Sequence, residues 1–253
     1  MSAFSLGSLT FVCTFGGALI GGYIRSLLPP THLSKESQDV MRLGMGLVAT
    51  MTALLLGLVT ASARSTFDGQ DQAIRTSAAN ILSLDRLLAR YGQETAPTRE
   101  LLRQTLACRI ETMWPSDGTE GQSLHNLRSV PVVEGIENQI LALTPSTDTQ
   151  RWMKSEALKL SEEVMKSRWR ILSSQDGTVS MVFLAVVIFW LTVTFASFGL
   201  YAPPNLSVVA VLFVSALSVA AAVFLLLELD SPFEGLIRIS SGPMRFALSQ
   251  LGQ

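Results

Sequence analysis

The sequence predicts an all-α integral membrane protein, with four transmembrane helices and a helical domain inserted between the second and the third. Three observations support this fold class. Charged residues make up only 15% of the 253 residues, against roughly 25% in soluble domains, and the mean hydropathy is +0.38. Three long stretches carry no charge at all. Between the second and the third stretch the charges return, and apolar residues there recur at helical spacing.

The charge-free stretches cover residues 1–24, 43–63 and 177–227. A helix crosses the hydrocarbon core of a bilayer in about 20 residues. The third stretch is 51 residues long, so it must hold two spans. The four predicted spans are Leu6–Leu28, Val40–Ala63, Val179–Tyr201 and Leu206–Leu229.

Two prolines divide the third stretch. Pro203 and Pro204 lack amide donors and stop a helix, and Asn205 or Ser207 can cap the helix that follows. The first stretch is predicted to be a span rather than a cleaved signal peptide. No basic segment precedes it, and it exceeds the usual apolar length of about 7–15 residues.

Four spans place the N-terminus, the insert and the C-terminus on the same side of the membrane. Lys and Arg near the span ends are more numerous on that side, and cytoplasmic loops carry an excess of these residues. The sequence therefore predicts a multi-pass protein of the inner (plasma) membrane, with the insert and both termini in the cytoplasm. One detail favours the reverse orientation, because the N-terminus is uncharged and Arg25 follows the first span.

The chain divides into four segments by composition. Residues 64–176 carry 14 basic and 15 acidic side chains, which suits a water-exposed domain. The predicted segments are transmembrane helices 1 and 2 at 1–63, a cytoplasmic helical domain at 64–176, transmembrane helices 3 and 4 at 177–230 and a cytoplasmic C-terminal tail at 231–253.

Apolar residues in the insert recur every three or four positions, the period of a helix with one buried face. The first such helix is predicted to end at Gly92, a residue suited to a helix C-cap, and the second at Trp114-Pro115. A polar loop is predicted at 116–123, and Ser146 or Thr147 can cap a long final helix. The apolar stripes are Ile74, Ala78, Ile81, Leu84, Leu88 and Tyr91; Leu102, Leu106, Arg109 and Met113; Val133, Ile136, Ile140 and Leu143; and Met153, Ala157, Leu160, Val164 and Ile171.

One face of the second span carries small, hydroxylated and basic side chains at helical spacing. We call it the small-residue face, and it consists of Arg42, Gly46, Thr50, Ala53, Gly57, Thr60 and Arg64. Small residues let two helices approach closely, so helix packing explains the pattern. The face would equally suit a pore, because small side chains leave room and the terminal arginines attract anions. The sequence leaves both interpretations open.

Three carboxylates lie at the end of the fourth span, at Glu228, Asp230 and Glu234. Oxygen-rich clusters can bind Ca²⁺, which takes about 6–8 oxygen ligands. The spacing is not that of an EF-hand, and one chain supplies few ligands. The alternative is a helix end with solvated acids, some of them paired with Arg238.

Several kinds of site lack candidate residues. The two histidines, His32 and His125, are far apart and offer almost no ligands for zinc and no acid–base pair. Cys13 and Cys108 lie in different segments and form no C-x-x-C motif. A nucleophile elbow, a P-loop and a dinucleotide-binding glycine motif are absent from the sequence. We therefore expect no enzymatic activity, no cofactor and no metal. The net charge of −1 gives no reason to expect nucleic acid as a partner.

Short segments along essentially the whole chain carry a resemblance to a known family. They are Phe15-Gly16-Gly17-Ala18-Leu19-Ile20-Gly21, Leu28-Pro29, His32-Leu33-Ser34, Arg42-Leu43-Gly44-Met45-Gly46-Leu47-Val48-Ala49-Thr50, Leu84-Asp85-Arg86, Tyr91-Gly92, Gln150-Arg151-Trp152, Phe198-Gly199-Leu200, Ala202-Pro203, Glu228-Leu229-Asp230, Pro232-Phe233 and Gly235. Together they resemble the bestrophin-like family of bacterial membrane proteins of unknown function.

The resemblance implies kinship to bestrophins, which are pentameric anion channels with four spans, a helical cytoplasmic region and a pore lined by the second span. In bestrophins a Pro-Phe segment beside acidic residues follows the last span, and Pro232-Phe233 occupies the corresponding place here. Two features depart from that pattern. Bestrophins narrow the pore with bulky apolar rings where this chain offers Gly, Thr and Ala, and their acidic run is reduced here to Glu234.

The resulting expectation is a homo-oligomeric ion channel, conducting anions, with the second span around a shared pore. The expected partners are the lipid bilayer, further copies of the chain (a pentamer by the resemblance) and small inorganic ions. Two alternatives stay open. One is a non-conducting scaffold or sensor whose helical insert binds a partner. The other is a cation channel, favoured by Glu228 and Asp230 at the cytoplasmic mouth.

Overall fold

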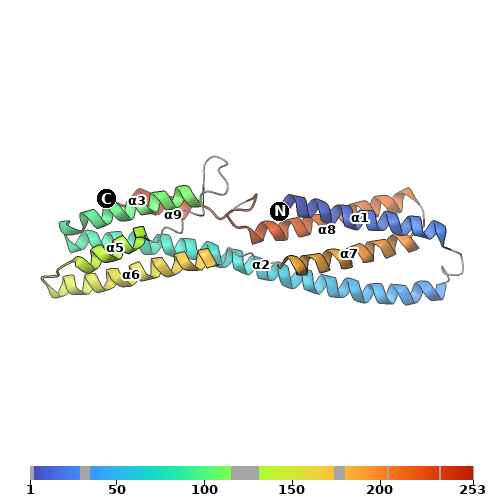
Figure 1. Cartoon of the computed structure of the whole chain (residues 1–253), viewed down its shortest axis with the longest axis horizontal. Coiled ribbons are helices and arrows are strands. Elements are labelled where there is room, and N and C mark those ends of the chain that lie inside the picture. Colours follow the sequence, from blue (N-terminus) through green and yellow to red (C-terminus); the bar gives the residue numbers. More distant parts are fainter. Residues whose placement is uncertain are drawn as a thin grey trace. The chain divides into compact units, whose positions relative to one another are not determined.

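The computed structural model describes residues 3–28, 35–114, 131–173, 180–203, 205–233 and 235–252 (Figure 1). The regular elements in these ranges are helices, which confirms the predicted all-α class. The chain forms two compact units. Unit 1 comprises Met1–Phe67 and Gly177–Ile237, and unit 2 comprises Asp68–Asp176 and Arg238–Gln253.

Four helices of the described residues are long and apolar enough to cross a membrane. They are α1 (Ala3–Leu27), α2 (Lys35–Tyr91), α7 (Met181–Tyr201) and α8 (Leu206–Asp230) (Figure 1). Except at the C-terminal end of α2, their bounds lie within a few residues of the predicted spans. The backbone of Asn205 is extended and caps α8 as predicted, although its side chain makes no capping hydrogen bond.

In unit 1, α1 packs against both α7 and α8. The core contains two clusters, each built from one residue of each helix. They are Leu6, Leu184 and Val223, and Ala18, Phe195 and Ala216. The rings of Phe11 and Phe15 on α1 meet Phe213 of α8 edge to face, at centroid distances of 5.4 Å.

Glycines bring α1 and α7 into backbone contact. A Cβ on Gly21 would overlap the carbonyl oxygen of Ala196, and a Cβ on Gly199 would overlap the carbonyl oxygen of Ala18. Each helix therefore has one glycine whose lack of a side chain leaves room for a carbonyl oxygen of the other helix. This is how small residues stabilise helix pairs in membranes, through close van der Waals contact.

Helix α2 is one continuous helix of 57 residues that contributes to both units. The sequence analysis did not predict this continuity. The change from apolar to charged residues after Ala63 marks the end of the apolar span, but no proline interrupts the helix. The helix ends at Tyr91 and Gly92 follows it, as predicted. The φ of Gly92 is 148°, which differs from the left-handed conformation of a usual C-cap glycine.

Unit 2 contains the remaining helices of the described residues. They are η2 (Gln93–Thr95), α3 (Ala96–Met113), α5 (Pro131–Ala142), α6 (Asp148–Ser173) and α9 (Gly242–Gln250). Most residues of the apolar stripes predicted for the insert are buried. At most 2% of the surface is exposed for five of them, namely Ile74, Leu84, Leu88, Leu106 and Ile140. The predicted polar loop at 116–123 lies outside the described residues.

The cap of α6 and the position of α9 complete unit 2. The amide of Gln150 donates to the hydroxyl of Thr147 at 3.1 Å, so Thr147 caps α6 as predicted. The segment predicted as a tail contributes α9, a helix that the sequence analysis did not predict. It packs against α3, its Met244 is completely buried, and the indole of Trp114 donates to the carbonyl of Ile239 at 2.8 Å.

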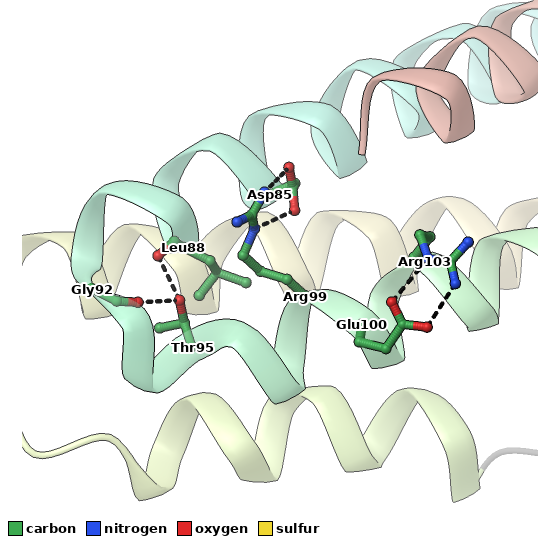
Figure 2. A network of polar contacts seen from close by, with 7 residues as sticks. All are labelled: Asp85, Leu88, Gly92, Thr95, Arg99, Glu100 and Arg103. Carbon is green, nitrogen blue, oxygen red and sulfur yellow. Dashed lines mark hydrogen bonds and ion pairs between the residues drawn. The ribbon is translucent and has the colours of Figure 1, made fainter. Parts of the chain in front are cut away.

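A polar network fixes the turn between α2 and α3 (Figure 2). The guanidinium of Arg99 donates to both carboxylate oxygens of Asp85, from Nε at 2.7 Å and from Nη2 at 3.0 Å. The hydroxyl of the buried Thr95 lies 2.6 Å from the carbonyl of Leu88 and 2.8 Å from that of Gly92. These contacts satisfy backbone carbonyls left open at the end of α2.

Candidate functional site

All seven residues of the small-residue face are exposed in the single chain. A Cβ on Gly46 or Gly57 would meet no atom of the chain within 4 Å. Helix α2 is the least buried of the four apolar helices, with 6% of its most apolar stretch buried against 33% for α1. In the part of the chain that the structure describes, the residues of the small-residue face therefore stay exposed and are not covered by another helix.

The other sides of α2 differ from this face. One carries residues that are fully or partly buried on their own chain, namely Met45, Val48, Thr52, Leu55, Val59 and Ala63. Another carries exposed large apolar residues, namely Leu43, Leu47, Leu54 and Leu58. The first is the intramolecular contact and the second suits lipid. The small-residue face therefore differs from both: its residues are not buried against their own chain, and they are not the large apolar residues that suit lipid.

The threonines of the face are bonded to their own helix. The hydroxyl of Thr50 donates to the carbonyl of Gly46 at 2.7 Å, and that of Thr60 donates to the carbonyl of Leu56 at 2.7 Å. This local bond satisfies the hydroxyl proton of each threonine without a partner from another helix. The lone pairs of both hydroxyl oxygens then remain available on the exposed face.

The arginines at the two ends of the face have neighbours on α2. Arg42 lies 3.9 Å from Asp39, and both side chains are more than two-thirds exposed. An exposed pair at this distance contributes little to stability. Arg64 lies over the ring of Phe67, with its guanidinium carbon 5.7 Å from the ring centroid. The charge of each arginine stays near one end of the face.

The structure describes two of the three carboxylates of the predicted acidic cluster, Glu228 and Asp230. The carboxylate of Glu228 is buried and accepts hydrogen bonds from the amides of Leu236 at 2.5 Å and Ile237 at 3.3 Å. Asp230 ends α8, and Glu234 lies outside the described residues. No group of three metal-ligating side chains occurs among the residues described.

The sequence analysis missed the use of Glu228 as a clamp on the chain that follows α8. The available signal was Gly235, which has a φ of 83° and carries no Cβ that would collide with the Glu228 carboxylate. A glycine with positive φ lets the chain turn back after a helix. A glutamate at the end of that helix can then bind the backbone amides of the returning chain through its carboxylate.

The fold and the apolar helices define an all-helical membrane protein. The model of the Bestrophin-like domain matches residues 12–244, and the chain therefore belongs to the Bestrophin-like family. No curated protein matches the sequence.

Solved structures share this fold at low sequence identity. A variant of a bacterial bestrophin homologue from Klebsiella pneumoniae matches with a TM-score of 0.68 and 15% identity, over 97% of this chain and 98% of that one. A second variant of that protein gives 0.65 and 15%, over 98% and 99%. A crystal structure of a membrane protein gives 0.67 and 14%, over 98% and 99%. The likeness therefore extends over the whole length of both chains.

Proposed function

We propose that this protein is a homo-oligomeric ion channel whose pore is lined by the small-residue face of α2. The observation that carries the proposal is the exposure of all seven residues of that face, on a helix whose neighbouring sides contact the chain itself or suit lipid. The four apolar helices of one described chain leave this face exposed. A ring of identical α2 helices around a symmetry axis would enclose a pathway lined by it.

The proposed membrane topology follows the charge distribution. The four apolar helices span the membrane, and unit 2 and both termini lie in the cytoplasm, where Lys and Arg are in excess. Membership of the Bestrophin-like family supports a pore shared between copies of the chain, and a pentamer is the expected assembly.

Anions are the first candidate for the conducted ion. Arg42 and Arg64 place positive charge at both ends of the face, and the face itself carries no carboxylate. Positive charge at a pore mouth raises the local concentration of anions. The amides of Leu236 and Ile237 bind the carboxylate of Glu228, which weakens the argument for an acidic ring at the cytoplasmic end.

Cations are the second candidate, and a different observation favours them. The hydroxyl protons of Thr50 and Thr60 are directed to helix carbonyls, so the face presents oxygen lone pairs. Oxygen acceptors coordinate hard cations. Flux selectivity distinguishes the two candidates.

The test is flux from liposomes combined with thiol labelling. The starting variant replaces the two free cysteines, Cys13 and Cys108, by alanine. A water-soluble thiol reagent should then reduce ion flux in T50C, which lies on the small-residue face, and leave L54C unaffected. Comparison of chloride with potassium flux identifies the ion. Equal labelling effects at both positions, or no flux of either ion from a defined oligomer, would leave the face as a helix-packing surface of a non-conducting scaffold.

A further inference from the structure

The chain passes from one unit to the other at three places. The first lies inside the continuous helix α2. The second, between Asp176 and Gly177, lies outside the described residues. The third lies between Ile237 and Arg238. We call residues 235–241 the crossing segment, and it connects the end of α8 to the start of α9.

On the side of unit 1, the crossing segment is bound to Glu228 of α8. The amides of Leu236 and Ile237 donate to Oε2 of Glu228 at 2.5 Å and 3.3 Å, and only 6% of this glutamate is exposed. Gly235 permits the approach, because its φ is 83° and a Cβ there would collide with the carboxylate. Hydrogen bonds to an ionised carboxylate are roughly twice as strong as neutral ones, so this end of the segment is firmly held.

On the side of unit 2, the crossing segment is bound to Trp114. The indole Nε1 of Trp114 donates to the carbonyl of Ile239 at 2.8 Å, and the Ile239 side chain is buried. The chain then enters α9 at once. The amide of Gly242 donates to the hydroxyl of Ser240 at 3.1 Å, and Met244 is completely buried where α9 packs against α3.

A single residue, Arg238, separates the two bound parts of the crossing segment. A chain extends by at most about 3.6 Å per residue, so the Cα atoms of Ile237 and Ile239 can lie at most about 7 Å apart. The segment therefore has almost no spare length. A shift of Trp114 and α9 cannot be absorbed between Ile237 and Ile239. It must either stretch the hydrogen bonds to Glu228 or move the end of α8 as well.

The attachment to Glu228 is not needed to hold α9. Met244, Ala247 and Leu251 already bury one apolar face of this short stretch. Burial of the Glu228 carboxylate costs free energy unless hydrogen bonds compensate it, and the amides that do so belong to the crossing segment. The last turn of α8 thus depends on the position of a segment that unit 2 also holds.

We propose that the crossing segment couples the two units mechanically. A change in how Trp114 holds Ile239 alters how Glu228 holds Leu236 and Ile237, and the reverse also applies. Coupling of this kind is reciprocal, so each attachment affects the other by the same free energy. The crossing segment is therefore a path by which a change within unit 2 reaches a membrane-spanning helix. The proposal does not depend on the channel proposal, because neither attachment involves the small-residue face.

The test is amide hydrogen exchange of the full-length protein in detergent, followed by mass spectrometry of peptides from the crossing segment and from α9. Trp114→Phe keeps an aromatic ring and removes the donor to Ile239. It should speed exchange of the Leu236 and Ile237 amides by about two- to tenfold, the effect of losing one neutral hydrogen bond. Glu228→Gln keeps the side-chain shape without the charge, and it should speed exchange within α9 by a similar factor.

Two controls separate coupling from a general loss of stability. Arg103→Met also changes α3 but removes only an exposed pair with Glu100, so it should leave exchange of the crossing segment unchanged. Insertion of Gly-Ser-Gly directly after Arg238 adds about 10 Å of chain and leaves both attachments in place. In that background Trp114→Phe should affect α9 alone, and Glu228→Gln should affect residues 235–237 alone.

The two directions of the test are independent of each other. If Trp114→Phe does not fold, Glu228→Gln measures the same coupling from the other side, since the effects are reciprocal. Faster exchange across the crossing that the insertion removes is the expected result. Exchange changes confined to the mutated side in the parent chain, or effects across the crossing that persist after the insertion, would overturn the proposal.

Discussion

Arg99 and Asp85 form a two-pronged ion pair that joins α3 to α2 next to the turn between them (Figure 2). The Asp85 side chain is completely buried, and the Arg99 side chain keeps 22% of its surface exposed. The hydrogen bond that Arg99 donates to Asp85 is the main cause that raises the pKa of Arg99. Arg99 is thus the cation that balances the buried charge of Asp85 in the described residues.

Arg99→Ala should destabilise unit 2 by about 3–5 kcal/mol, because it leaves a buried carboxylate without a partner. Arg103→Ala removes an ion pair whose side chains are about half exposed and should cost about 0–1 kcal/mol. Chemical denaturation followed by circular dichroism measures both. Equal losses of unfolding free energy in the two variants would mean that the burial of Asp85 adds nothing to the strength of its ion pair.

The Glu100 variant tests the pH dependence of the neighbouring pair. Hydrogen bonds from Arg103 and Gln104 lower the pKa of Glu100 from 4.5 to about 2. A lowered carboxylate pKa stabilises the fold above the unfolded value, and the contribution is lost as pH falls through the folded value. The Tm difference between the parent protein and Glu100→Gln should therefore be constant above pH 4.5 and shrink towards zero near pH 2. A difference that persists at pH 2 would contradict this assignment.

Gly235→Ala should destabilise the segment after α8 by about 1–3 kcal/mol, because it combines a left-handed φ with a collision against the Glu228 carboxylate. Gly252→Ala is the matched control. Its φ of 86° is nearly the same as the 83° of Gly235, and no atom lies within 4 Å of the added Cβ. Thermal unfolding of both variants isolates the Glu228 contact. If the two variants lose the same stability, backbone conformation alone explains the effect.

Gly21→Ala should destabilise the contact between α1 and α7 by about 1–3 kcal/mol, as expected for a methyl group forced into a packed interface. Gly16→Ala on the same helix adds a methyl group where no atom lies within 4 Å, and it should be neutral or slightly stabilising. Unfolding in detergent, monitored by circular dichroism, compares the two. Equal losses of stability in Gly16→Ala and Gly21→Ala would contradict close packing against α7 as the cause.

Much of the fold follows from local chemistry that the sequence displays directly. Charge-free stretches and prolines located α1, α7 and α8, because a bilayer tolerates neither charges nor unsatisfied amides. The continuity of α2 was not predictable in the same way. A change of solvent alters which side chains are favourable but leaves the backbone hydrogen bonds of a helix intact. Helix α9 was missed because its only strong signal is the short apolar spacing of Met244, Ala247 and Leu251.

The candidate sites divide along similar lines. The small-residue face is a periodic pattern on one helix, so its seven members could be grouped before their exposure was known. The role of Glu228 depends on a chain reversal that brings the amides of Leu236 and Ile237 back to it, and periodicity carries no information about a reversal. Arg109 was placed within an apolar stripe by its spacing, and its Nε is buried in the structure.

The glycine contact between α1 and α7 restricts how unit 1 can move. A slide of α1 by one residue is about 1.5 Å and would carry the carbonyl of Ala18 away from the space that Gly199 leaves for it. The two helices should consequently move as one body. Any opening or closing within unit 1 must then come from α2 shifting against this pair, because α2 is the apolar helix with the least burial to lose.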